Sequence, residues 1–167
     1  MLRPCLILVA CIALGAPAVS AQNGLVLPTS TSEVGPWEAA VWTRDRVVLR
    51  CTMARTRSTP KDVNYGILID GDGILLGVAN RNWKFTSQTP TQATLAPQDG
   101  GARTLTARPV SNIRANIDLP REMLDQLQRS EHADVQIGDS KVRLPFDDFN
   151  AARVTLEICV QKLGRKN

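Results

Sequence analysis

Residues 65–79 read Tyr-Gly-Ile-Leu-Ile-Asp-Gly-Asp-Gly-Ile-Leu-Leu-Gly-Val-Ala, two short apolar runs separated by Asp70-Gly71-Asp72-Gly73. Asp-Gly pairs accept the positive backbone φ that tight hairpin turns need, so this stretch predicts a β-hairpin. Both runs are apolar at nearly every position, which predicts a central pair of strands covered on both faces. The fold is therefore expected to be built around a β-sheet.

The chain before the hairpin also carries a strand pattern. Residues 37–43 are expected to be extended, and residues 44–53 alternate between two faces. A period of two is typical of a strand with one wet face. One face holds Val47, Leu49, Cys51 and Met53, and the other holds Arg44, Arg46, Val48, Arg50 and Thr52.

The chain after the hairpin adds short strands and two helices. Residues 83–85, 105–107 and 112–119 are expected to be extended, and Pro120 opens an amphipathic helix over 121–129. Gly138-Asp139 predicts a turn in a second hairpin over 135–144. Asp147 is expected to cap a last helix that Gly164 ends. The predicted fold is mainly β, an antiparallel β-sandwich or open barrel with two short helices, the last one C-terminal.

Residues 1–21 are typical of a secretory signal peptide. Arg3 precedes an apolar run over 5–19, and small residues follow up to Ala21. The run is shorter than the ~20 residues that cross a bilayer, which disfavours a membrane anchor, and a lipobox reading at Leu8–Cys11 would leave too short an apolar segment. We therefore expect a periplasmic or secreted protein without a transmembrane anchor after cleavage. Residues 22–36 are expected to be a flexible lead-in, and residues 37–167 a single β-rich domain.

Two cysteines remain after removal of the signal segment, Cys51 and Cys159. Cys51 faces the core of its predicted strand, and Cys159 lies on the apolar face of the last predicted helix. A lone pair in an oxidising compartment is usually bridged, so we predict a disulfide between them, with two buried thiols as the alternative.

The three arginines at 44, 46 and 50 form the most suggestive polar feature. On one strand face they could hold an anionic ligand, because guanidinium groups pair with phosphate and carboxylate. A solvated strand face that resists edge pairing explains the same row. The formal net charge of +4 is small and no basic run is present, so nucleic acid is not an expected partner.

The sequence offers little for catalysis. The single histidine, His132, is expected in a solvated loop, and no motif supplies it with a nucleophile. Counted as a calcium loop from Asp70, positions five and twelve are Ile74 and Arg81, which cannot supply the ligand oxygens. We therefore expect no cofactor, no metal site and no enzyme activity. Two alternatives stay open: a hydrolase using Asp147 and Asp148, and an inhibitor that presents residues 55–63 or 86–103 to an envelope-directed enzyme.

The order of several motifs resembles a group of exported proteobacterial proteins that includes the invasion-associated locus B family. These motifs are Gly35-Pro36-Trp37, Cys51 in a strand, Gly73 to Trp83, the hairpin at 135–144, and a helix with Ala152, Leu156 and Cys159. The resemblance implies an exported β-sandwich-like module without catalytic residues. The expected function is a non-catalytic binding or interaction module of the bacterial cell envelope, whose partner is an envelope component or a protein.

Overall fold

The hairpin predicted from residues 65–79 lies at the centre of the sheet. Strands β4 (Val63–Asp70) and β5 (Gly73–Asn80) pair along their whole length around a turn at Gly71 and Asp72. The backbone N–H of Asp72 donates to Oδ1 of Asp70 at 2.9 Å. This side-chain turn explains the Asp-Gly repeat, because aspartate hydrogen-bonds its own backbone two residues on.

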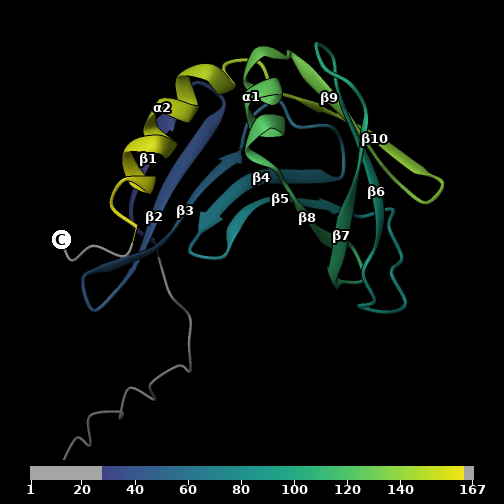
Figure 1. Ribbon diagram of the computed structural model, residues 1–167, viewed down its shortest axis with the longest axis horizontal. Coiled ribbons are helices and arrows are strands. Elements are labelled where there is room, and N and C mark those ends of the chain that lie inside the picture. Colours follow the sequence, from purple (N-terminus) through teal and green to yellow (C-terminus); the bar gives the residue numbers. More distant parts are fainter. Residues whose placement is uncertain (1–27, 164–167) are drawn as a thin grey trace, which may run out of the picture.

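The computed structural model describes residues 28–163, in which this hairpin is extended on both sides into one antiparallel sheet (Figure 1). The strand order is β1-β2-β3-β4-β5-β8-β7-β6-β9-β10, so β1 and β10 are the two free edges of an open sheet. The other strands are β1 (Pro28–Val34), β2 (Trp37–Arg44), β3 (Val47–Arg55), β6 (Thr91–Pro97), β7 (Arg103–Ser111), β8 (Arg114–Asp118), β9 (His132–Ile137) and β10 (Ser140–Pro145).

Two helices complete the core. Helix α1 (Arg121–Arg129) packs beside α2 (Phe149–Val160), and α2 lies over β2 and β3 (Figure 1). The inner face of the sheet is buried beneath them, as Met53, Leu76 and Val78 show at 0% exposure. The prediction of a mainly β, antiparallel fold with two short helices is confirmed, and the sheet is open rather than closed.

Residues 28–34 are an edge strand and not part of the flexible lead-in predicted for 22–36. They pair with β2 around a turn at Gly35, which has a φ of +59°. The Ser/Thr-rich strand is exposed on both faces, so its sequence carries no hydrophobic alternation. The predicted signal peptide at 1–21, residues 22–27 and Gly164 lie outside the described residues.

The strand predicted over 44–53 is a hairpin. Asp45 and Arg46 have φ values of 52° and 66° and form the turn between β2 and β3, the type of turn that positive φ at both central residues favours. The register shifts near Trp42 and Thr43. As a result Val48 is 1% exposed and Leu49 is 36% exposed, the reverse of the predicted faces.

The central hairpin is covered on one face only, contrary to the prediction of two covered faces. Tyr65 and Ile67 are buried on the inner face, whereas Leu68 and Leu75 remain half-buried on the outer face. Residues 83–85, predicted as a strand, lie in an irregular loop. Trp83 is nevertheless buried there, and its indole N–H donates to Oγ of Ser140 at 2.8 Å.

Helix α2 is held at several points. Cys159 is joined to Cys51 of β3 by the predicted disulfide, which closes a separation of 108 residues. Asp148, not Asp147, is the N-cap residue, and its side chain makes no capping hydrogen bond. The buried Arg153 pairs with Asp125 of α1 at 2.6 Å and with Glu157 at 2.9 Å, so it fastens the two helices together.

Candidate functional site

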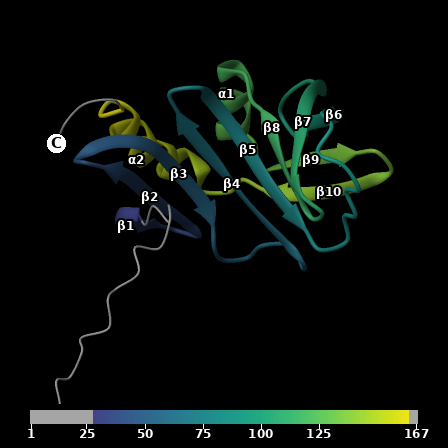
Figure 2. The same cartoon turned by 90° about the horizontal axis from the view of Figure 1, so that it is seen from below.

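A shallow groove crosses the outer face of β3, β4, β5 and β8, the face directed away from the helices. Its floor is a row of small residues, because Ala54 pairs with Gly66, Gly66 with Gly77, and Gly77 with Asn116. Figure 2 shows these four strands side by side. The hollow has a volume of about 430 Å³, within the range of small-molecule sites.

The walls of the groove come from the neighbouring rows of the same strands. On one side Thr52 pairs with Leu68 of β4, which presents an apolar edge. On the other side Asn64 pairs with Ala79, and Ala79 pairs with Arg114. Side chains on one face of a sheet alternate with those on the other, so every second residue of each strand contributes.

Glycine is present at Gly66 and at Gly77 for different structural reasons. A Cβ on Gly66 would lie 2.6 Å from the carbonyl oxygen of Met53 and 2.9 Å from Cα of Ala54, so the packing of β3 against β4 requires glycine there. The atoms nearest to a Cβ on Gly77 would be Asn116 Oδ1 at 3.4 Å, Arg114 Nη2 at 3.7 Å and Gly66 O at 3.8 Å, all at ordinary contact distance. Gly77 therefore leaves a space that a methyl group would fill without disturbing the backbone.

The polar groups of the groove converge on that space from β8. Within residues 28–163 the Arg114 guanidinium makes no ion pair, and Arg114 is the one charged residue that lines the groove. Arg108 of β7, which lies opposite Asn116 on the same outer face, is instead paired with Asp118. The groove thus offers one positive charge without an ion pair and two amides, Asn64 and Asn116, beside an apolar floor.

A second hollow of about 520 Å³ lies beyond Leu75, between the start of β5 and β7. Its lining includes Arg108 and Asp118, which neutralise one another. Because the one cation in its lining, Arg108, already has a carboxylate partner, we regard the smaller groove as the stronger candidate.

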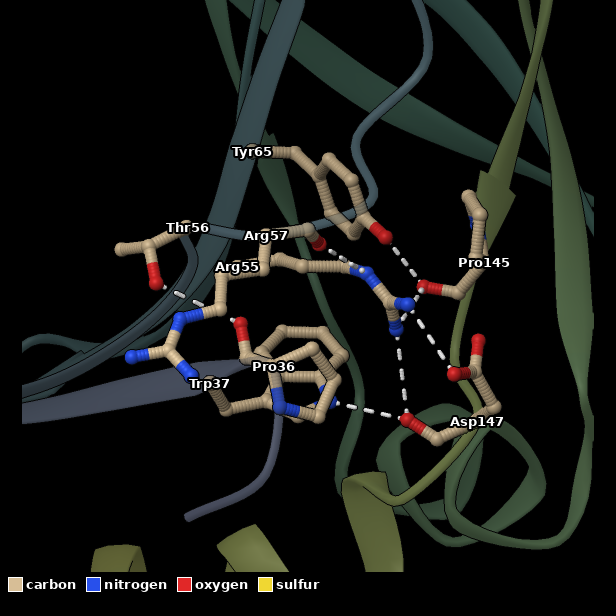
Figure 3. A network of polar contacts seen from close by, with 8 residues as sticks. All are labelled: Pro36, Trp37, Arg55, Thr56, Arg57, Tyr65, Pro145 and Asp147. Atoms are coloured by element: carbon tan, nitrogen blue, oxygen red, sulfur yellow. Dashed lines mark hydrogen bonds and ion pairs between the residues drawn. The ribbon is translucent and has the colours of Figure 1, made fainter. Parts of the chain in front are cut away.

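A buried arginine organises the opposite face of the sheet. Arg55 is 4% exposed, and its guanidinium donates to the carbonyls of Arg57 at 3.0 Å and Asp147 at 3.3 Å and to Oδ2 of Asp147 at 3.0 Å. Figure 3 shows that the Tyr65 hydroxyl and the Trp37 indole N–H point to the same segment, donating to the carbonyls of Pro145 and Asp147. The network fastens the connection between β10 and α2 to β3 and β4.

Burial keeps the Tyr65 hydroxyl of this network protonated. It raises the pKa of the Tyr65 hydroxyl well above its usual range, although the nearby Arg55 opposes the shift, so the hydroxyl remains a donor. The Arg55 guanidinium also lies 5.6 Å from the Trp37 ring centroid, within cation–π distance. Every donor here is directed at a protein acceptor, so the arrangement has a structural role.

The predicted arginine row is not one strand face. Arg44 ends β2, Arg46 lies in the turn, and Arg50 lies on β3 with its guanidinium 5.9 Å from the Trp42 ring centroid. All three side chains are exposed at the same end of the hairpin. The expectation that they bind an anion stays a prediction, but its geometric basis in a period of two is wrong.

The other residues weighed for chemistry are dispersed. The Asp147 carboxylate accepts from Arg55, and the Asp148 carboxylate lies beside Gly35. His132 is not in a loop but is the first residue of β9 and is half-buried. Among residues 28–163, no three His, Cys, Asp or Glu side chains gather closely enough to hold a metal ion. No helix in the same range is long and apolar enough to cross a membrane.

The groove was not predicted from the sequence, although the sequence carries one signal for it. A turn at Gly71 and Asp72 pairs residues symmetrically about itself, and this symmetry places Gly66 opposite Gly77. The contribution of β8 could not be found in this way, because each β8 residue lies 35 or more positions further along the chain than the β5 residue it pairs with.

Comparison with known proteins supports the fold. No protein-family model matches the sequence, and no curated protein matches it. Among solved structures, the crystal structure of invasion associated protein B from Bartonella henselae is similar, with a TM-score of 0.57 and 14% sequence identity over 80% of this chain and 98% of that chain. The resemblance that the sequence predicted from Gly35 to Cys159 is thus confirmed for the fold.

Proposed function

We propose that the protein is an exported, non-catalytic binding module of the bacterial cell envelope and that the outer groove holds its ligand. The observation that carries this proposal is the convergence of Arg114 and Asn116 on the space above Gly77. A charged group that is left without a protein partner beside an apolar floor is available to a ligand.

Several features support binding rather than catalysis. No carboxylate, imidazole or thiol lines the groove, so its residues offer no general base. The Asp147 carboxylate, considered for a hydrolase, is engaged by Arg55 at 3.0 Å. The disulfide fits an oxidising compartment, and the structural relative bears a name that refers to invasion.

The proposal is tested on protein recovered from the envelope fraction of a bacterium that produces the full chain. Native mass spectrometry should detect a small molecule that survives gentle purification. Its release should shift the backbone amide resonances of Gly66, Gly77 and Asn116. Bound material that shifts only amides near Arg44, Arg46 and Arg50, chemical conversion of the bound molecule by the protein, or recovery of the protein in the cytoplasmic fraction would each contradict the proposal.

A further inference from the structure

We infer that the outer groove takes a small amphipathic carboxylate, with its carboxylate above Gly77 and its apolar chain along the floor toward Ala54. This inference rests on the proposed function and adds to it the chemical class and the orientation of the ligand.

The charge of the groove selects a single negative charge. Arg114 is the one charged residue in the lining, and it has no ion pair within the described chain, whereas the neighbouring Arg108 is paired with Asp118. A guanidinium group donates to both oxygens of a carboxylate in a planar fork. One cation compensates one carboxylate, but it leaves half the charge of a phosphate dianion unbalanced.

Asn116 supplies a second polar contact at the same place. Its Oδ1 lies 3.4 Å from the position that a Cβ of Gly77 would occupy, and Arg114 Nη2 lies 3.7 Å from that position. A half-turn of the amide presents its NH₂ donors instead of its oxygen. In the structure the space that Gly77 leaves open is bordered by one donor, Arg114 Nη2, and by one acceptor, Asn116 Oδ1, so a bound carboxylate requires this half-turn of the Asn116 amide.

The remainder of the groove is suited to an aliphatic chain. From Asn116 the floor continues over Gly77 and Gly66 to Ala54, with Leu68 along one side. From Gly77 on β5 to Ala54 on β3 the path crosses two strand spacings, or roughly 10 Å at about 4.8 Å per spacing. A chain of that length would cover the apolar outer surface of β4 and β5, which no element of the described structure covers.

The chain offers matched variants for a test. Arg114→Gln removes the unpaired cation, and Arg108→Gln removes a cation from the same face that already has a partner. Gly77→Ala fills the space above the floor, and Gly101→Ala adds a methyl group where no atom lies within 4 Å. Melting temperatures of all four variants should remain close to that of the wild type, because none of these side chains is needed by the core.

The experiment titrates the purified full chain with decanoate below its micelle concentration and follows the amide resonances by NMR. We expect saturable shifts at Gly66, Gly77 and Asn116, and at least tenfold weaker binding of the neutral analogue decanol. Arg114→Gln should weaken decanoate binding at least tenfold and Gly77→Ala at least fivefold, whereas Arg108→Gln and Gly101→Ala should change it less than twofold.

The outcomes separate this inference from the proposed function. If decanol and decanoate bind in the groove equally, or if Arg114→Gln has no effect, the carboxylate inference is wrong while the groove remains a binding site. If envelope-recovered protein carries a ligand in the groove that is not a carboxylate, the inference is likewise wrong. If neither the probes nor any recovered molecule shift the groove resonances, both the inference and the proposed function fail.

Discussion

Replacing Arg55 with methionine tests whether the buried guanidinium holds the connection between β10 and α2 in place. The change keeps an unbranched side chain of similar reach in a site where Arg55 is 4% exposed. It removes all the hydrogen bonds that the guanidinium makes to Arg57, Pro145 and Asp147. It also removes the positive charge beside the Trp37 ring.

The size of the effect follows from what each acceptor loses. Removing one partner of a fully buried ion pair costs about 3–5 kcal/mol. The Asp147 side chain is 51% exposed, so water can solvate its carboxylate once Arg55 is gone. The carbonyls of Pro145 and Asp147 keep hydrogen bonds from Tyr65 and Trp37. We therefore expect a loss of about 2–3 kcal/mol in the free energy of unfolding, because most acceptors stay satisfied.

Thermal unfolding followed by circular dichroism measures this loss. For a domain of this size, about 2–3 kcal/mol lowers Tm by about 6–12 °C. Arg55→Lys should recover little, because an ammonium group cannot span the carbonyls and the carboxylate as the planar fork does. The control is Arg57→Gln, since Arg57 and Glu33 form a pair with side chains 63% and 62% exposed, and such pairs contribute about 0–1 kcal/mol. A methionine variant that melts within about 2 °C of the wild type would refute the reasoning. A decrease in Tm that small is what the loss of an exposed ion pair would cause, and it would show that the buried hydrogen bonds of Arg55 add little stability.

Three further predictions address other parts of the fold. Reduction of the Cys51–Cys159 disulfide should lower the free energy of unfolding by about 4–5 kcal/mol, because a crosslink that closes a loop of this length strongly reduces the entropy of the unfolded chain. Equal denaturant midpoints with and without reductant would contradict this. Hydrogen bonds from Arg143 lower the pKa of Asp134 from 3.8 to about 2, so its stabilising effect is full above pH 3.8 and is lost as the pH falls toward 2. Asp134→Asn should therefore destabilise at pH 7 and much less at pH 2, and an equal loss at both pH values in urea unfolding would show that the charge is irrelevant. Simultaneous replacement of the exposed Arg44, Arg46 and Arg50 by glutamine should change Tm by less than about 3 °C, because the contact that is lost is the cation–π contact of Arg50 with Trp42. If the variant still binds anionic vesicles as the wild type does, these arginines are not an anion-binding site.

The sequence predicted those elements whose signals are local. The turns at Gly71-Asp72 and Gly138-Asp139 and the helix over 121–129 lie where glycine, aspartate, proline and a helical apolar period indicate them. The disulfide was also accessible, because only two cysteines remain outside the predicted signal segment. In each case the residues that decide the structure are close in the chain, or few enough to leave one pairing.

The errors have a common physical cause, which is that contacts from distant segments outweighed local pattern. Residues 28–34 form a strand because β2 supplies their hydrogen bonds, although the strand itself buries no regular face. The bulge near Trp42 exchanged the inner and outer positions of Val48 and Leu49. Arg55 begins the segment 55–63 that the inhibitor alternative expects to be presented to a partner, but its carboxylate partner Asp147 lies 92 residues away. Hydropathy alone could not show that this cation would be buried and satisfied.

The groove lies on the outer face of the central hairpin, which was wrongly predicted to be covered on both faces. Strands with apolar residues on both faces are expected to be buried on both faces. The pattern does not indicate which element or molecule covers each face. The helices and the curved sheet cover the inner face, and Leu68 and Leu75 remain half-buried on the outer face. In the next outer row Gly66 and Gly77 lower the surface, and β8 brings Arg114 to the rim of the groove. Glycines on the outer face reduce the apolar surface that the hairpin exposes, which is a structural reason for them. An arginine beside them without an ion pair contributes little to folding, so it has no such structural reason. The combination is accounted for when the second cover of the hairpin is a ligand with a carboxylate at one end.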